Sequence, residues 1–264
     1  MTELLAIKSV SKAFGGNRVL EEVDFSVSAN EIVGLLGPNG SGKSTLLNII
    51  TGFEALDGGE VVFEGDQIGR LRAHKIVSRG IARTFQLPSM PRMMSVIEVA
   101  MAAETPHHGF WSTLLGTPAS RSTEDKARRK ADALLEEFLL SPVRDLSAAS
   151  LSGGQKKLLS IVCALMAEPK VLMLDEPTAG VHPNLRRGIV DALLRLSGQG
   201  MTLVVVEHDM HFIRELCQRC VVLDRGRIVA SCRPDELAQN ERVLEAYLGT
   251  PRPAKSMSMQ GCQA

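Results

Sequence analysis

The feature that most constrains this fold is a nine-residue stretch, Gly37-Pro38-Asn39-Gly40-Ser41-Gly42-Lys43-Ser44-Thr45. It matches G-x-x-x-x-G-K-[ST], the pattern of the phosphate-binding P-loop. An apolar run at 32–36 precedes it and an apolar run at 46–50 follows it, which predicts a strand, a glycine-rich turn and a helix. The N–H groups of such a turn and the helix N-terminus attract phosphate. We therefore expect Lys43 to reach the β- and γ-phosphates of a nucleotide and Ser44 to ligate Mg²⁺.

Composition narrows the class of protein. The chain has 264 residues, and its 30 basic and 30 acidic residues cancel, so no bulk positive field favours nucleic acid as a partner. No apolar run approaches the ~18–20 residues that span a bilayer, and the first residues lack a secretory-signal pattern. The five cysteines are scattered, which favours a reducing cytosol. We interpret Cys217 and Cys220 as packing residues rather than metal ligands.

Hydrophobic patterning predicts the fold class. Alternating apolar residues at 4–10 and 23–27 predict an antiparallel β opening, whereas the apolar runs at 171–174 and 203–206 predict buried parallel strands. Residues 87–145 lack strand signals, and an amphipathic helix is expected there, with its start capped at Ser122.

We therefore predict an α/β fold with a P-loop NTPase core. It has a mostly parallel sheet, an N-terminal antiparallel β subdomain and a helical subdomain inserted at about 87–150. The tail at 250–264 is rich in Pro, Ser and Met, and we expect it to be disordered.

Polar residues follow three of the expected strands. Asp175 and Glu176 follow the run at 171–174, Gln86 follows 81–85, and His208 follows 203–206. Ligands bind at the carboxyl ends of strands in open α/β sheets. We expect Asp175 to hold Mg²⁺, Glu176 to act on the attacking water, and His208 to sense the γ-phosphate. Gln86 either contacts the ligand or merely begins a loop.

The sequence leaves the roles of two further segments open. Phe14 precedes a glycine turn, where it either packs against the turn or stacks on adenine. The segment Ser152-Gly153-Gly154-Gln155 opens an expected helix, and free N–H groups there favour a second anion site.

In combination these motifs resemble the ATP-binding subunit of an ABC transporter. GPNGSGKST, Gln86, LSGGQ at 151–155, VLMLDE at 171–176 and His208 occur in that family's order, over about residues 4–249. The resemblance implies one ATPase domain at 1–249 and a head-to-tail dimer. Each ATP then lies between one P-loop and the partner's LSGGQ segment, so residues 152–155 meet the γ-phosphate held by the other subunit.

The resemblance also implies residue roles. It implies that Phe14 stacks on adenine and that Gln86 touches Mg²⁺ and the attacking water. The implied catalytic set is Lys43, Gln86, Glu176 and His208, and the implied metal ligands are Ser44, Gln86 and Asp175. The segment 179–182 lies at the family's D-loop position but reads Ala-Gly-Val-His instead of the commoner Ser-Ala-Leu-Asp.

Four segments narrow the resemblance: IARTFQ at 81–86, LLGTP at 114–118, EHDM at 207–210 and EAYLG at 245–249. They are similar to the branched-chain amino-acid uptake ATPases. That implies a second ATPase subunit, two membrane permeases, a solute-binding protein and a cytoplasmic location at the inner face of the cell membrane. A urea or amide importer and a lipopolysaccharide exporter are the alternatives. A non-transport ABC ATPase acting on DNA would need long coiled-coil arms, which the sequence lacks. The solute, and whether the partner ATPase is identical, stay open.

Overall fold

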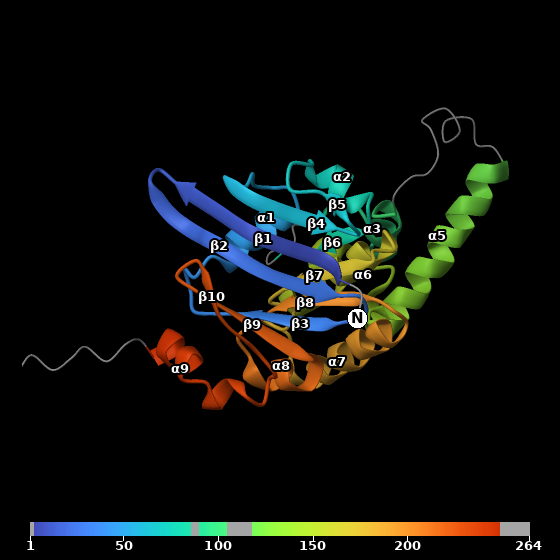
Figure 1. Ribbon diagram of the computed structural model, residues 1–264. Helices are drawn as coiled ribbons and strands as arrows, with labels where there is room; N and C mark the ends of the chain where they lie inside the picture. The colour runs from blue at the N-terminus through green and yellow to red at the C-terminus, as the bar shows by residue number, and fades with distance from the viewer. Residues whose placement is uncertain (1–2, 86–89, 105–117, 249–264) are drawn as a thin grey trace, which may run out of the picture.

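Two β-sheets organise the computed structural model, which describes residues 3–85, 90–104 and 118–248 (Figure 1). The smaller sheet has the strand order β2-β1-β4-β5 and is antiparallel. Its strands are β1 (Glu3–Phe14), β2 (Asn17–Ser28), β4 (Gly58–Phe63) and β5 (Asp66–Gln67). The predicted antiparallel opening is therefore confirmed, with Gly15 and Gly16 forming the turn between β1 and β2.

The larger sheet is the core of the molecule and has the strand order β10-β9-β3-β8-β7-β6. Its strands are β3 (Ile32–Leu36), β6 (Ile81–Arg83), β7 (Val171–Asp175), β8 (Thr202–Val206), β9 (Arg219–Asp224) and β10 (Arg227–Cys232). All pairings are parallel except the edge pair β9 and β10. Every residue of β3, β7 and β8 is buried, which explains their continuous apolar sequences.

The two faces of the central sheet are covered by different elements. Along β7, Val171 and Met173 pack with α1 (Lys43–Ile50) and the antiparallel sheet. Leu172 and Leu174 point to the other face. There they pack among residues of α6 (Gly153–Met166), α7 (Pro183–Gly198) and α8 (Met210–Leu216). This alternation follows from the period of two in a strand, and it places the sheet inside the molecule.

A helical part precedes α6 in the chain and packs against it. It contains α3 (Val96–Ala102), α5 (Pro118–Glu137) and two 3-10 turns, η1 (Ser141–Val143) and η2 (Ala148–Ser150). The helix α5 projects from the body in Figure 1. It begins at Pro118, so the predicted start with a cap at Ser122 was wrong. Proline is favoured in the first turn, because the N–H that it lacks has no helical acceptor there.

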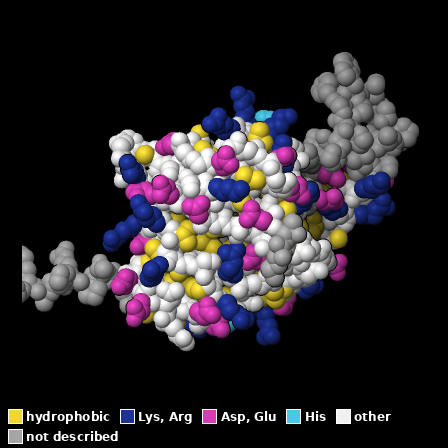
Figure 2. Space-filling model, in the orientation of Figure 1, with side chains coloured by type: hydrophobic (Ala, Val, Ile, Leu, Met, Phe, Trp, Pro, Cys, Tyr) yellow, Lys and Arg dark blue, Asp and Glu magenta, His cyan; other side chains and the backbone are white. Residues whose placement is uncertain are grey.

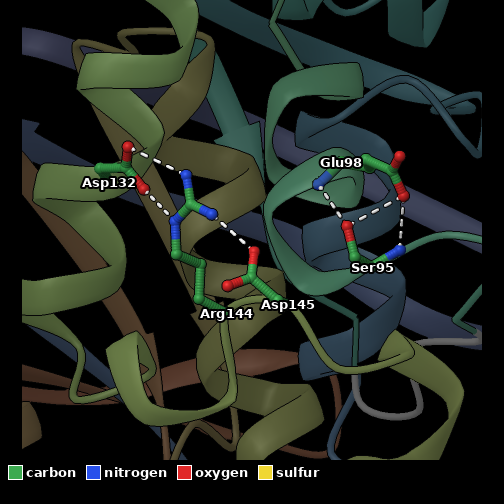
Figure 3. Close-up of polar contacts among 5 residues, drawn as sticks. All are labelled: Ser95, Glu98, Asp132, Arg144 and Asp145. Atoms are coloured by element: carbon green, nitrogen blue, oxygen red, sulfur yellow. Dashed lines mark hydrogen bonds and ion pairs between the residues drawn. The ribbon is translucent and has the colours of Figure 1, made fainter.

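Polar contacts fix this helical part internally (Figure 3). Ser95 and Glu98 form a capping box at the start of α3, in which the Ser95 N–H donates to Glu98 Oε2 at 2.7 Å. Arg144 Nε donates to Asp132 Oδ1 at 2.6 Å, which ties the segment after η1 to α5. The carboxylates of Asp132 and Asp145 raise the pKa of Arg144.

The remaining elements are α2 (Ala73–Val77), η3 (Leu237–Gln239) and the final helix α9 (Glu241–Leu248). Among the residues that the structure describes, no helix combines the length and apolar character needed to cross a bilayer. Lys and Arg side chains are interspersed with Asp and Glu side chains over the face drawn in Figure 2. That distribution agrees with the balanced charge of the sequence.

Candidate nucleotide site

The P-loop (residues 37–45) joins β3 to α1 through a tight turn that needs glycine. Gly37, Gly40 and Gly42 have φ angles of 148°, 79° and 109°, a region that residues with a side chain rarely adopt. A Cβ atom at Gly37 would lie 2.0 Å from the Leu223 carbonyl oxygen, and one at Gly42 would lie 2.7 Å from Leu20 Cδ2. The close approach of β9 and β2 therefore fixes the shape of the turn.

Polar groups of the turn are arranged to receive an anion. The helix α1 starts after Gly42 without a side-chain cap, so its first N–H groups lack a capping acceptor. The buried Ser41 hydroxyl has no hydrogen-bond partner. Unsatisfied donors around a glycine cradle are the arrangement that binds polyphosphate. The residues present thus fit the phosphates of a nucleotide.

Lys43 lies folded over the same turn. Its Nζ donates to the carbonyl oxygens of Gly37 at 2.8 Å and Pro38 at 2.9 Å. Burial lowers the pKa of Lys43, while the nearby carboxylates of Glu176 and Asp175 act in the opposite direction. The ammonium group is therefore close to both acidic residues predicted for the site.

Asp175 ends β7 and is held by residues from the end of β6. Arg83 Nη2 donates to Asp175 Oδ2 at 2.9 Å, and both side chains are nearly inaccessible. Arg83 Nη1 also donates to Asn48 Oδ1 of α1 at 2.7 Å. The Asp175 N–H donates to Thr84 Oγ1 at 3.2 Å. Sequence reasoning gave Arg83 no role, although a basic residue inside an apolar strand is a signal for a buried partner.

Glu176 and His208 lie together, as the sequence predicted from their strand exits. His208 Nδ1 is 3.6 Å from Glu176 Oε1. The Glu176 backbone has a φ of 48°, its N–H donates to the Val206 carbonyl at 2.8 Å, and its carbonyl accepts from Lys157 Nζ at 2.7 Å. The parallel order β3-β8-β7 brings these residues to the same sheet edge as the P-loop. Gln86, the fourth predicted member of this edge, lies outside the described residues.

Glu207, which directly follows β8, supports the same edge, a role that the sequence did not reveal. It is buried, and its Oε1 accepts hydrogen bonds from the N–H and the hydroxyl of Thr178. Its Oε2 accepts from the His208 N–H at 3.1 Å. Glu207 therefore joins the segment after Glu176 to the backbone of His208.

The start of α6 forms a separate turn. Ser152 is its N-cap: Ser152 Oγ accepts from the Gln155 N–H at 3.3 Å, and Gln155 Oε1 accepts from the Ser152 N–H at 3.0 Å. The N–H groups of Gly153 and Gly154 have no partner within a helix, as in any first turn. Ser152 and Gly153 are exposed. The turn can bind an anion, and in this structure the Gln155 side chain serves as a cap.

The aromatic residues near the site are accessible. Phe14 is the last residue of β1 and is 45% exposed, with Lys12 Nζ at 5.0 Å from its ring centroid. A ring exposed to that extent is accessible for stacking. Tyr247 of α9 accepts a hydrogen bond from the Gly37 N–H at 3.0 Å. It is the only tyrosine in the chain, and its position in a terminal helix gave no signal of this contact.

The cysteine pair is part of the core. Cys217 and Cys220 are free and buried, and a Cβ atom at Gly34 would lie 3.2 Å from Cys217 Sγ. Burial raises the pKa of Cys220 to about 12. Within residues 3–85, 90–104 and 118–248, no group of three or more His, Cys, Asp or Glu residues could hold a metal ion.

This architecture defines a class. Strand β3 of the parallel sheet leads through a glycine-rich turn into helix α1, and acidic residues lie at the carboxyl end of β7. This arrangement is the P-loop nucleoside triphosphatase fold. The sequence model of the ABC transporter family matches residues 20–179, and the chain belongs to that family. Its ATP-binding cassette hydrolyses ATP to power transport, so this protein is an ABC transporter ATPase.

Several curated relatives are similar over nearly their whole length. The high-affinity branched-chain amino acid transport ATP-binding protein BraF of Pseudomonas aeruginosa is 34% identical, covering 93% of this chain and 98% of the relative. The probable branched-chain amino acid transport protein LivG of Methanocaldococcus jannaschii is 36% identical, covering 94% and 98%. The lipopolysaccharide export protein LptB of Haemophilus influenzae is 34% identical, covering 93% and 97%.

Solved structures agree with the fold. A nucleotide-free ATP-binding cassette from an ABC transporter superposes with a TM-score of 0.81 at 35% identity, covering 94% of this chain and 100% of that structure. The cassette MJ1267 in its ADP conformation gives the same TM-score, identity and coverage. The predicted fold class is therefore confirmed.

Proposed function

We propose that this chain is the ATP-hydrolysing subunit of an importer for branched-chain or other hydrophobic amino acids. The observation that carries ATP hydrolysis is the meeting of the P-loop with Glu176 and His208 at one sheet edge. Import is supported by the relatives BraF and LivG, which are named as branched-chain amino acid transport proteins. The lipopolysaccharide export protein LptB is equally similar, so export is the alternative to test.

The chain's own residues have distinct roles in this proposal. The P-loop N–H groups and Lys43 bind the phosphates, and Phe14 stacks on the adenine. Ser44, Asp175 and Gln86 hold Mg²⁺, a hard cation that takes oxygen ligands; when bound, it neutralises charge on the phosphates. Arg83 donates to Oδ2 of Asp175, which leaves the other carboxylate oxygen, Oδ1, for the Mg²⁺.

Glu176 accepts a proton from the attacking water, or orients that water, and the adjacent His208 binds the γ-phosphate. Both side chains retain access to solvent, at 28% for Glu176 and 65% for His208. A water molecule can therefore reach the pair. General-base catalysis of this kind contributes about 10²–10⁴-fold to a rate.

The other half of each site comes from a second ATPase subunit packed head-to-tail. Ser152 and Gly153 are exposed, and the first turn of α6 presents N–H groups without helical partners. In the dimer they face the γ-phosphate held by the partner, and Gln155 preserves the turn through the capping box. Lys43 and the partner's turn then stabilise charge that develops during hydrolysis.

Replacing Ser152 with alanine tests the shared site. We expect the kcat for ATP hydrolysis to fall by about 10-fold or more in the assembled complex, since a donor to the developing charge and a helix cap are both lost. ATP affinity of the isolated chain should stay within about twofold, because its own P-loop is intact. Alanine at Ser150 is the matched control, since that hydroxyl binds only the local Ser147 carbonyl. A Ser152→Ala complex with unchanged kcat would contradict the shared-site arrangement.

The proposed partners also include two membrane permeases and, through them, a solute-binding protein. Phe53 and Phe85 support a permease contact. They are 55% and 48% exposed and form a T-shaped pair with ring centroids 5.3 Å apart. Phe85 immediately precedes Gln86 in the chain. Exposed aromatic side chains next to one another are typical of protein interfaces. In this proposal the protein works in the cytoplasm, at the inner face of the cell membrane.

Import and export can be separated by reconstitution. The affinity-tagged full chain, purified with its membrane partners, is placed in liposomes with either labelled leucine and the copurified solute-binding protein, or labelled urea. We expect ATP-dependent leucine accumulation that disappears with Glu176→Gln. A complex without a solute-binding protein, whose ATPase responds to lipopolysaccharide and not to leucine, would instead establish the exporter alternative. ATP-dependent urea accumulation would establish a urea importer.

A further inference from the structure

Lys157 makes an unusual contact for a residue of the α6 helix. It lies two positions after the LSGGQ segment, and its Nζ donates to the backbone carbonyl of Glu176 at 2.7 Å. A hydrogen bond from an ammonium group is stronger than one between neutral groups. The lysine is half-buried, so water screens this contact less than it screens a fully exposed pair. The helix that carries LSGGQ is therefore bound directly to the backbone of the proposed catalytic residue.

The Glu176 backbone needs such support. Its φ of 48° lies in the left-handed region, which residues with a Cβ atom occupy only when their surroundings hold them there. The Val206 carbonyl holds the Glu176 N–H from β8, and Lys157 holds the Glu176 carbonyl from α6. The direction of the Glu176 carboxylate depends on both anchors, because they fix the peptide groups on either side of its Cα atom.

A second, independent contact joins the same helix to the end of the same segment. The backbone of Gly154 packs so closely on residues 180–181 that an added Cβ atom would lie 3.2 Å from both Gly180 O and Val181 Cα. The α6 helix thus touches the segment 176–181 at its beginning through Lys157 and at its end through Gly154. In the middle, Thr178 donates to the Oε1 of Glu207, the residue that directly follows β8.

We propose that Lys157 is a positioning residue that couples the two ATP sites of the dimer. Through Lys157, a shift of α6 moves the backbone of Glu176, which serves the chain's own ATP. The N-terminus of the same helix serves the ATP held by the partner. This inference rests on the proposed function, which assigns Glu176 to catalysis and the LSGGQ turn to the partner's site.

The test uses the full-length protein in its complex with the membrane partners. Lys157→Met removes the ammonium group and keeps the length of the side chain, Lys157→Arg keeps the charge and donors, and Lys156→Met changes the adjacent lysine as the control. For Lys157→Met we expect kcat to fall about 10–100-fold, because a small displacement of a reacting group has effects of that order. ATP affinity by equilibrium binding should change less than about twofold, since the P-loop is untouched.

Coupling between the two ATP sites is measured separately from kcat, by the Hill coefficient for ATP. In Lys157→Met the Hill coefficient for ATP should fall towards 1, because the two sites then act separately. Lys157→Arg should recover most of kcat and of cooperativity, while Lys156→Met should match the unmodified protein in both. A purely structural role would instead lower thermal stability and ATP affinity, and arginine would not restore cooperativity.

Each result of these measurements either supports or contradicts the role of Lys157 in coupling. The inference is overturned if the kcat of Lys157→Met equals that of Lys156→Met, if kcat falls with an unchanged Hill coefficient, or if ATP affinity falls in parallel. Glu176→Gln is measured beside these variants. If it is inactive while Lys157→Met is unaffected, the coupling inference fails and the proposed function stands. If Glu176→Gln keeps its activity, the proposed catalytic assignment fails first.

Discussion

Replacing Glu176 with glutamine is expected to lower the kcat for ATP hydrolysis by about 10²–10⁴-fold, the usual contribution of a general base. Glutamine keeps the size of the side chain and can still hydrogen-bond water, but it cannot accept a proton at neutral pH. His208, whose Nδ1 lies 3.6 Å from Glu176 Oε1, is assigned to the γ-phosphate in this proposal and not to the attacking water. ATP binding should be unchanged, because the P-loop and Lys43 carry it.

The control for this prediction is Glu168→Gln. Glu168 has nearly the same backbone conformation, with a φ of 49° against 48° for Glu176. Its side chain is 80% exposed and pairs with Lys130 away from the P-loop. We expect this variant to keep full ATPase activity. Steady-state phosphate release and equilibrium binding of ATP distinguish the two variants, and near-normal turnover by Glu176→Gln would exclude its catalytic assignment.

Replacing Arg83 with methionine is expected to lower the free energy of unfolding by about 3–5 kcal/mol, the range found when one partner of a buried ion pair is removed. The side chains of Arg83 and Asp175 are only 6% and 5% exposed, so the carboxylate left behind would be buried without its cation. Asn48 would also lose the donor to its side-chain oxygen.

The control for Arg83→Met is a variant of a solvent-exposed ion pair. Arg79 and Asp66 lie 2.7 Å apart, yet their side chains are 41% and 69% exposed. Arg79→Met should therefore change stability by only about 0–1 kcal/mol. Urea unfolding followed by circular dichroism measures both variants. The double variant Arg83→Met with Asp175→Asn should be less unstable than the sum of its single changes, since no unpaired charge remains. Equal midpoints for Arg83→Met and Arg79→Met would refute the importance of the buried pair.

The sequence by itself determined the elements whose physical requirements are local. Residues 37–45 need glycine at positions of positive φ, so the pattern identifies the turn. Complete burial of β3, β7 and β8 requires apolar residues throughout, so the strands were visible as runs. The start of α6 at Ser152 is also local and was predicted from the Ser-Gly-Gly turn, whereas its capping box with Gln155 was found in the structure.

Only the tertiary structure decided the partners of the site residues. Arg83 and Asp175 are 92 positions apart, Lys157 and Glu176 are 19 apart, and Gly37 and Tyr247 are 210 apart. Each contact depends on strand order and on how helices pack against the sheet, and a hydrophobic pattern carries no information about either. The pattern states which face of an element is buried, but not which element covers it. For that reason the sequence predicted the nucleotide site, whereas the residues that hold its carboxylates in place emerged only from the fold.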